Sequence, residues 1–186
     1  MAQEHITDVS NGIHMEPLHE TVEAMREKPE LGKCTFFARN KWVGGCRNQT
    51  AISDYYCCEQ RWSHPETFRL DCDEPLSLGG EQSAPNPVEH LLNALAGCLT
   101  TALVAHAAVR GIHLEEVESE LEGDIDLRGF LGLDPRAPKG YTSIRVKFRV
   151  KGDQRDAEQL KKLAEFSPVY NTLIHSTHVD LDIETL

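Results

Sequence analysis

The stretch that decides the fold is Pro87-Val-Glu-His-Leu-Leu-Asn-Ala-Leu-Ala-Gly-Cys98-Leu-Thr-Thr-Ala-Leu-Val-Ala-His-Ala-Ala-Val-Arg110. From Leu91 to Val109 it carries no formal charge, and this length is close to that of a membrane span. It is rich in alanine and interrupted by polar residues, so it is weakly hydrophobic on every side. That composition suits burial inside a protein better than contact with lipid. Because Pro87 suits a first helical turn and Gly111 a C-terminal cap, we predict one long buried helix between them.

Strand patterns flank this helix on both sides, and two shorter amphipathic helices accompany them. The expected strands are Cys34–Val43, Gln49–Cys58, Glu66–Cys72, Glu115–Leu127, Tyr141–Lys151 and His178–Ile183, and the expected shorter helices are Met15–Lys28 and Asp156–Phe166. Because the strands arrive in runs rather than alternating with helices, the fold class is α+β. We predict an N-terminal extension with a short helix over residues 1–32 and one folded domain over residues 33–186.

The segment Gly129–Gly140 is expected to be a loop. It combines Phe130, Leu131 and Leu133 with glycines and prolines, so it is apolar but unable to continue a strand. We expect a mobile rim that packs against a partner subunit or a ligand.

The charge balance disfavours nucleic acid as a partner. The chain has 19 basic and 30 acidic residues and a formal charge of −11, whereas nucleic-acid binding requires a basic face. The same charge disfavours anionic membranes. The first residues lack the basic start and apolar run of a secretory signal, so we expect a cytoplasmic protein. Its six cysteines, without a CxxC pair, are then expected to be reduced.

Three motifs resemble the OsmC-like (osmotically inducible protein C) family, which includes the organic hydroperoxide resistance proteins. The first is Asp73-Glu-Pro-Leu-Ser-Leu-Gly-Gly80 followed by Ala84-Pro-Asn-Pro-Val-Glu-His-Leu-Leu-Asn-Ala-Leu-Ala-Gly-Cys98. The second is Arg110-Gly-Ile followed by Glu122-Gly-Asp-Ile-Asp-Leu-Arg-Gly-Phe-Leu-Gly-Leu133, and the third is Ser167-Pro-Val-Tyr-Asn171. The order and spacing of the motifs make the combination specific.

The resemblance implies a homodimer in which two sheets wrap around paired central helices, with no metal and no bound organic cofactor. The best-known branches are thiol peroxidases. In them a central-helix cysteine attacks a hydroperoxide, a second cysteine forms a disulfide with it, and an arginine and a glutamate tune the first thiolate. By this correspondence Cys98 is the peroxidatic cysteine, and Ser167 stands where the second, resolving cysteine would be. Arg47 and Glu89 each lie one position away from the family's arginine and glutamate.

The residues themselves leave these roles open. A free cysteine among alanines is commonly a small buried apolar residue. A reactive Cys98 would need a cation such as Arg47, because the helix N-terminus is too far away to help. The alternative for Arg47 is a solvated charge. Glu89 precedes Cys98 by nine residues, which places the two side chains on opposite faces of a straight helix. Cys46 is an alternative resolving thiol.

Two functions follow. The first is reduction of organic hydroperoxides through Cys98 alone, with an external thiol as reductant. The alternative is a non-catalytic member of the family that binds a small apolar or acyl ligand in the dimer crevice, with Cys98 lining it. Retention of Cys98 and Arg47 favours the first function, and the serine at position 167 favours the second.

Overall fold

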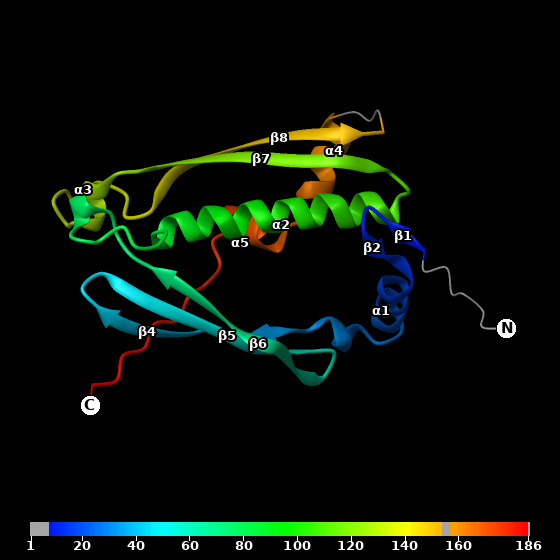
Figure 1. Ribbon diagram of the computed structural model, residues 1–186, viewed down its shortest axis with the longest axis horizontal. Helices are drawn as coiled ribbons and strands as arrows, with labels where there is room; N and C mark the ends of the chain where they lie inside the picture. Colours follow the sequence, from blue (N-terminus) through cyan, green and yellow to red (C-terminus); the bar gives the residue numbers. More distant parts are fainter. Residues whose placement is uncertain (1–7, 154–156, 186) are drawn as a thin grey trace. The chain divides into compact units, whose positions relative to one another are not determined.

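The computed structural model describes residues 8–153 and 157–185 (Figure 1). The elements are β1 (Val9–Ser10), β2 (Ile13–His14), α1 (Met15–Glu27), η1 (Pro29–Gly32), β3 (Thr35–Phe36), β4 (Arg39–Gly44), β5 (Arg47–Cys57), β6 (Gln60–Cys72), η2 (Leu76–Leu78), α2 (Pro87–Val109), β7 (Leu114–Ile125), α3 (Leu127–Phe130), β8 (Tyr141–Gly152), α4 (Ala157–Ala164) and α5 (Pro168–His175). The chain forms two compact units, residues 8–9 with 14–91 and residues 10–13 with 92–185. The division at residue 32 stays a prediction.

The first unit is built on an antiparallel sheet in which β5 is central. β3 and β4 pair with one edge of β5, and β6 pairs with the other. β3 and β4 together occupy the predicted strand Cys34–Val43. The expected strand Glu66–Cys72 begins earlier than predicted, because β6 starts at Gln60 and runs through residues 63–65. The chain turns instead at Cys58 and Glu59, whose φ angles of 50° and 59° suit a two-residue hairpin turn.

This sheet has one apolar face. Tyr55 stacks on Phe36 with ring centroids 5.8 Å apart, and the His64 ring lies between Tyr55 and Phe68. The other face is polar: Gln49 pairs with Asp71 across the sheet and donates to its carboxylate. Phe36 is 77% exposed within the single chain, so the apolar face is left largely uncovered.

A buried carboxylate ties three strands of this sheet together. Asp54 follows a bulge in β5 and accepts hydrogen bonds from Ser53, from Arg39 at the start of β4 and from Arg61 on β6. These bonds, with that from Ser53 first, hold the pKa of the Asp54 carboxyl well below its usual range. The carboxylate therefore contributes to stability through its charged form.

The second unit packs α2 beneath the β7–β8 hairpin (Figure 1). Leu95, Leu99, Leu103 and Ala107 recur every four residues and form a buried stripe on α2. Leu163 and Ala164 of α4 complete the core with residues of the hairpin. Gly111 has a φ of 65°, so the predicted cap at the end of the helix is confirmed. By length and composition α2 could cross a membrane, but its leucine stripe is used in the core.

The outer face of the β7–β8 hairpin is a ladder of opposite charges. Glu116, Glu118, Glu120 and Glu122 of β7 lie opposite Lys151, Arg149, Lys147 and Arg145 of β8. The apolar side chains alternate with these charges and contact α2. The strand predicted over Tyr141–Lys151 is therefore confirmed as β8.

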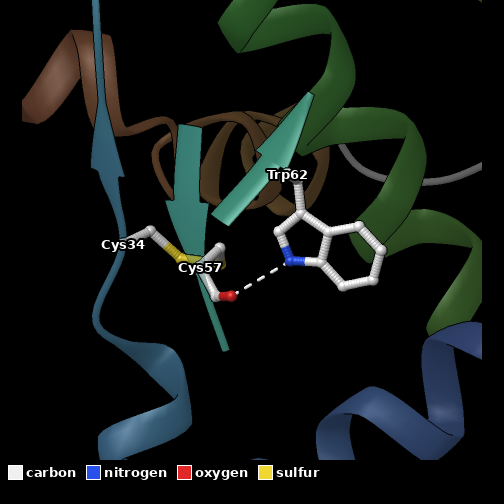
Figure 2. Close-up of a disulfide and its surroundings, with 3 residues drawn as sticks. All are labelled: Cys34, Cys57 and Trp62. Carbon is white, nitrogen blue, oxygen red and sulfur yellow. Dashed lines mark hydrogen bonds between the residues drawn. A yellow bond between two sulfur atoms is a disulfide. The ribbon is translucent and has the colours of Figure 1, made fainter. Parts of the chain in front are cut away.

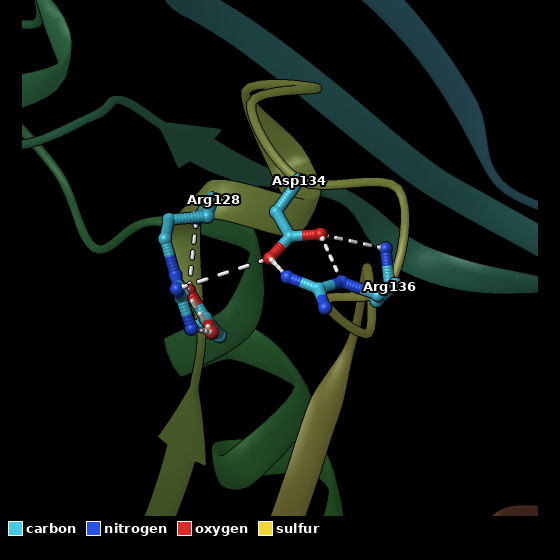
Figure 3. Close-up of polar contacts among 4 residues, drawn as sticks. Arg128, Asp134 and Arg136 are labelled. Atoms are coloured by element: carbon cyan, nitrogen blue, oxygen red, sulfur yellow. Dashed lines mark hydrogen bonds and ion pairs between the residues drawn. The ribbon is translucent and has the colours of Figure 1, made fainter.

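The loop after β7 carries a small network of ion pairs (Figure 3), and its expected mobility stays a prediction. Arg128 forms ion pairs with Asp126 and Asp134, and Asp134 also binds Arg136. A Cβ at Gly129 would lie 2.1 Å from the carbonyl oxygen of Pro138, so only glycine allows this approach. Phe130, Leu131 and Leu133 are nevertheless exposed, and no described part of the chain covers them.

The C-terminal end differs from the prediction in two ways. The structure forms a helix, α5, after Ser167, where no helix was predicted. The predicted strand His178–Ile183 is absent, and the described residues from 176 to 185 have neither helix nor strand. Val179, Leu181 and Ile183 do alternate as in a strand, but a strand needs a neighbour to take up its hydrogen bonds. In this chain no described strand pairs with them.

Candidate functional site

Cys98 lies near the middle of α2, half-buried, next to Leu99 of the buried stripe. It is eleven residues after Pro87, which corresponds to about 16 Å along the helix axis. The partial positive charge of a helix N-terminus acts only over the first turn. Activation of the Cys98 thiol therefore has to come from a side chain outside its own helix turn.

Glu89 forms a capping box at the start of α2. The Asn86 N–H donates to Glu89 Oε2, and the Glu89 N–H donates to Asn86 Oδ1, each at 2.8 Å. This reciprocal pair satisfies two backbone donors that the first turn would otherwise leave unpaired. Along α2, Glu89 and Cys98 are about 14 Å apart on opposite faces, so the helix does not bring their side chains together.

Arg47 begins β5 and faces the segment that leads into α2. Its guanidinium lies 3.9 Å from the carboxylate of Glu81, and both side chains are largely exposed. The neighbouring Cys46 Sγ lies 3.7 Å from the carbonyl oxygen of Leu78. The turn between β4 and β5 thus contacts the 73–86 segment at two points, and Arg47 lies beside it.

Asp73 organises that segment, a role that sequence reasoning missed. The carboxylate is 1% exposed and accepts from the backbone N–H groups of Glu74, Glu81 and Ser83 and from Ser83 Oγ. These hydrogen bonds, led by that from the Ser83 backbone, lower the pKa of Asp73 to about 2. An aspartate at a strand end before a glycine-rich loop was the available signal.

Ser167 is fully buried and caps α5. Its Oγ accepts a hydrogen bond from the Tyr170 N–H at 3.2 Å, and its own N–H donates to the carbonyl of Ala164. Pro168 follows at the first helical position. Ser167 therefore has a structural use in this chain, as the buried cap of α5.

A cavity of about 560 Å³ opens in the second unit between α2, β8, α4 and α5. Its walls are apolar, and Lys161, Glu165 and Tyr170 supply its polar groups. Leu99, the neighbour of Cys98, lines it. Its volume lies in the range of small-molecule pockets. Sequence reasoning placed a ligand in a dimer crevice and did not anticipate a cavity within one chain.

One cysteine pair is oxidised, so the expectation that all six cysteines are reduced was wrong. Cys34 and Cys57 form a disulfide, and Cys46, Cys58, Cys72 and Cys98 are free. The pairing depends on strand register, because Thr35 lies opposite Tyr56 and the next pair outward is Cys34 with Cys57. Register is a tertiary property that cysteine spacing does not reveal. Within residues 8–153 and 157–185, no three histidine, cysteine or carboxylate side chains gather as a metal site requires.

The family model described as OsmC-like protein matches residues 80–182, more than half of the chain. No curated protein sequence is significantly similar. A solved structure from Legionella pneumophila, named as an organic hydroperoxide resistance protein OsmC, is 26% identical with a TM-score of 0.52 and covers 74% of this chain and 89% of its own. An OsmC-like protein from Mycoplasma pneumoniae is 14% identical with a TM-score of 0.52, over 76% and 89% of the two chains. The fold is that of these proteins, and the chain belongs to the OsmC-like family.

Proposed function

We propose that this protein is a stress-defence enzyme that reduces organic hydroperoxides at Cys98. The observation that carries the proposal is a half-buried free thiol in the central helix of an OsmC-like fold. The name of the similar Legionella pneumophila protein, an organic hydroperoxide resistance protein, supports the substrate class. Cytoplasmic location is part of the same proposal.

The reaction requires one thiolate and two equivalents of an external thiol. The Cys98 thiolate attacks the peroxide oxygen, the O–O bond breaks, and the products are the Cys98 sulfenic acid and an alcohol after one proton is taken up. Because Ser167 cannot form a disulfide, an external thiol condenses with the sulfenic acid and releases water. A second thiol then restores Cys98 and leaves as a disulfide. In this scheme Arg47 and Glu89 tune the Cys98 thiolate, as the corresponding arginine and glutamate do in the peroxidases that the chain resembles.

We expect a homodimer in solution. Phe36 and Phe68 on the apolar face of the sheet, and Leu131 and Leu133 in the loop after β7, are exposed, and exposed apolar surface of this kind is typical of protein interfaces. The C-terminal residues around Leu181 also alternate like a strand that lacks a neighbour. Sedimentation equilibrium at micromolar concentration should give twice the 20.9 kDa chain mass. A stable monomer would contradict the expectation.

Consumption of an organic hydroperoxide, measured with monothiol and dithiol reductants, tests the proposed activity. Wild type should turn over slowly, and Cys98→Ser should fall to the uncatalysed rate. Arg47→Gln should lower the rate by weakening the thiolate, whereas Arg69→Gln, at an exposed arginine of the same sheet, should not. Glu89→Gln keeps a hydrogen-bond acceptor for the helix cap. A lower rate in that variant would therefore result from loss of the negative charge of Glu89.

Mass spectrometry of the Cys98 peptide provides the second readout. Trapping during turnover should find the sulfenic acid, and excess peroxide should produce sulfinic acid, because the usual disulfide partner is missing. Equal rates for wild type and Cys98→Ser, with Cys98 unmodified, would reject the peroxidase proposal. A disulfide between Cys46 and Cys98 would instead show that Cys46 is the resolving thiol.

A second candidate function is binding of a small apolar or acyl ligand. The observation that favours it is the apolar cavity of about 560 Å³ beside Leu99, together with the structural use of Ser167. Rejection of the peroxidase proposal by the kinetic test would leave this function as the one that the structure supports.

A further inference from the structure

The Cys34–Cys57 disulfide lies at the end of the sheet, on a different element from the proposed catalytic thiol. Cys34 immediately precedes β3, and Cys57 is the last residue of β5. Their Cα atoms are 4.2 Å apart, the short spacing of a non-hydrogen-bonded cross-strand pair. The two thiols are therefore positioned to form the bridge by strand pairing alone.

Three features distinguish this bridge from a buried structural disulfide. Both cysteines are only partly buried, so a reductant can reach the sulfur atoms. The strand that the bridge attaches, β3, is two residues long and lies at the edge of the sheet. Cys58, the residue after Cys57, is a free thiol in the adjoining turn.

The bridge also holds the N-terminal arm, residues 14–33, against the sheet. It joins residues 23 apart in the chain, and that interval contains β3, β4 and β5, whereas η1 and α1 precede it. Lys28 at the end of α1 forms an ion pair with Glu59 in the β5–β6 turn, but both side chains are about half exposed. Exposed ion pairs contribute little. The covalent link is accordingly the main attachment at this edge.

We propose that Cys34 and Cys57 are a reversible redox pair, a second peroxide-responsive centre that is independent of Cys98. In the reducing direction a dithiol attacks the bridge, a mixed disulfide forms, and the products are two cysteine thiols and the cyclic disulfide of the reductant. In the oxidising direction one thiolate attacks an organic hydroperoxide and yields a sulfenic acid and an alcohol. The other thiol then displaces water to remake the bridge.

Trp62 provides a built-in reporter for this pair. Its indole N–H donates to the carbonyl oxygen of Cys57 at 3.1 Å, beside the bridge (Figure 2). A disulfide close to an indole quenches its fluorescence, so reduction should brighten Trp62 and oxidation should dim it. The chain has two tryptophans, and Trp42→Phe leaves Trp62 as the single emitter.

The experiment uses the full-length double variant Cys98→Ser, Trp42→Phe. Three of the four free thiols then remain. The number of thiols titrated per chain should rise from three to five when a dithiol reduces the bridge. Cumene hydroperoxide, added after removal of the dithiol, should return the count to three. Fluorescence of Trp62 should rise and fall in step, and circular dichroism should stay that of the folded protein.

The matched control adds Cys34→Ser to the same variant. It should show no change in fluorescence and no gain of thiols with the dithiol, whereas Cys58→Ser should still cycle. A bridge that resists the dithiol until the protein is unfolded would overturn the proposal. So would a reduced pair that hydroperoxide does not reoxidise. Because Cys98 is absent, neither result bears on the proposed peroxidase activity.

Discussion

Leu103→Ala should lower the free energy of unfolding by about 2 to 5 kcal/mol, the range for a fully buried leucine truncated to alanine. Leu103 is 2% exposed and belongs to the stripe that joins α2 to α4 and to the β7–β8 hairpin. Its removal takes away apolar burial and leaves a cavity that a rigid helix cannot close. Denaturant titration at a fixed protein concentration measures the change, because association would otherwise shift the midpoint.

Leu76→Ala serves as the matched control for this substitution. Leu76 is 69% exposed in η2, so the same truncation there should change the free energy of unfolding little. Comparable losses in the two variants would mean that the packing of α2 does not dominate the stability of the protein.

Asp73→Asn should destabilise the protein at neutral pH and progressively less in acid. The folded pKa of Asp73 is lowered to about 2 from an ordinary value of 3.8, so the charged form is preferred in the folded state. A group with a depressed pKa contributes stability above its unfolded pKa, and that contribution is lost as pH falls toward the folded value. The asparagine carries no charge at any pH, so the gap to wild type should be constant above about pH 5 and close toward pH 2.

Thermal unfolding of both proteins between pH 2 and 7 measures this gap, which should reach several degrees at neutral pH. Asp182→Asn, at an exposed carboxylate of the C-terminal segment, should follow wild type throughout. A gap for Asp73→Asn that stays the same down to pH 2 would show that the carboxylate acts through its shape and not its charge. The neighbouring cap formed by Asn86 and Glu89 should remain intact in either case.

The elements predicted correctly are those whose signals are local. The long helix follows from the stretch Leu91–Val109 without formal charge, flanked by Pro87 and Gly111, and the strand Tyr141–Lys151 follows from its alternating pattern. The helix α5 also had local signals, Ser167 as cap and Pro168 in the first turn, which were read as a family motif and not as a helix start. In contrast, the segment around Leu181 alternates like a strand but has no partner in the chain to pair with.

The candidate site was less predictable because its contacts connect distant residues. Cys98 and Arg47 were singled out by resemblance, and the structure adds that Cys98 is half-buried on α2 and that Arg47 lies 3.9 Å from Glu81. Asp73 was missed because its partners, the N–H groups of Glu81 and Ser83, converge only once the loop has folded. The Cys34–Cys57 bridge was missed because it depends on the register of β3 against β5.

The charge ladder of the β7–β8 hairpin affects the register in which the two strands pair. Every outward residue of β7 from 116 to 122 is acidic and every residue opposite is basic. A shift of one strand by two positions would still place acidic residues opposite basic ones. The charges therefore stabilise the pairing of β7 with β8 but do not select one register. Gly123 restricts that choice, because a Cβ there would lie 2.3 Å from the Tyr141 ring. The alignment that places the Tyr141 ring beside Gly123 therefore requires a residue without a side chain, whereas the paired charges stabilise the hairpin in several alignments.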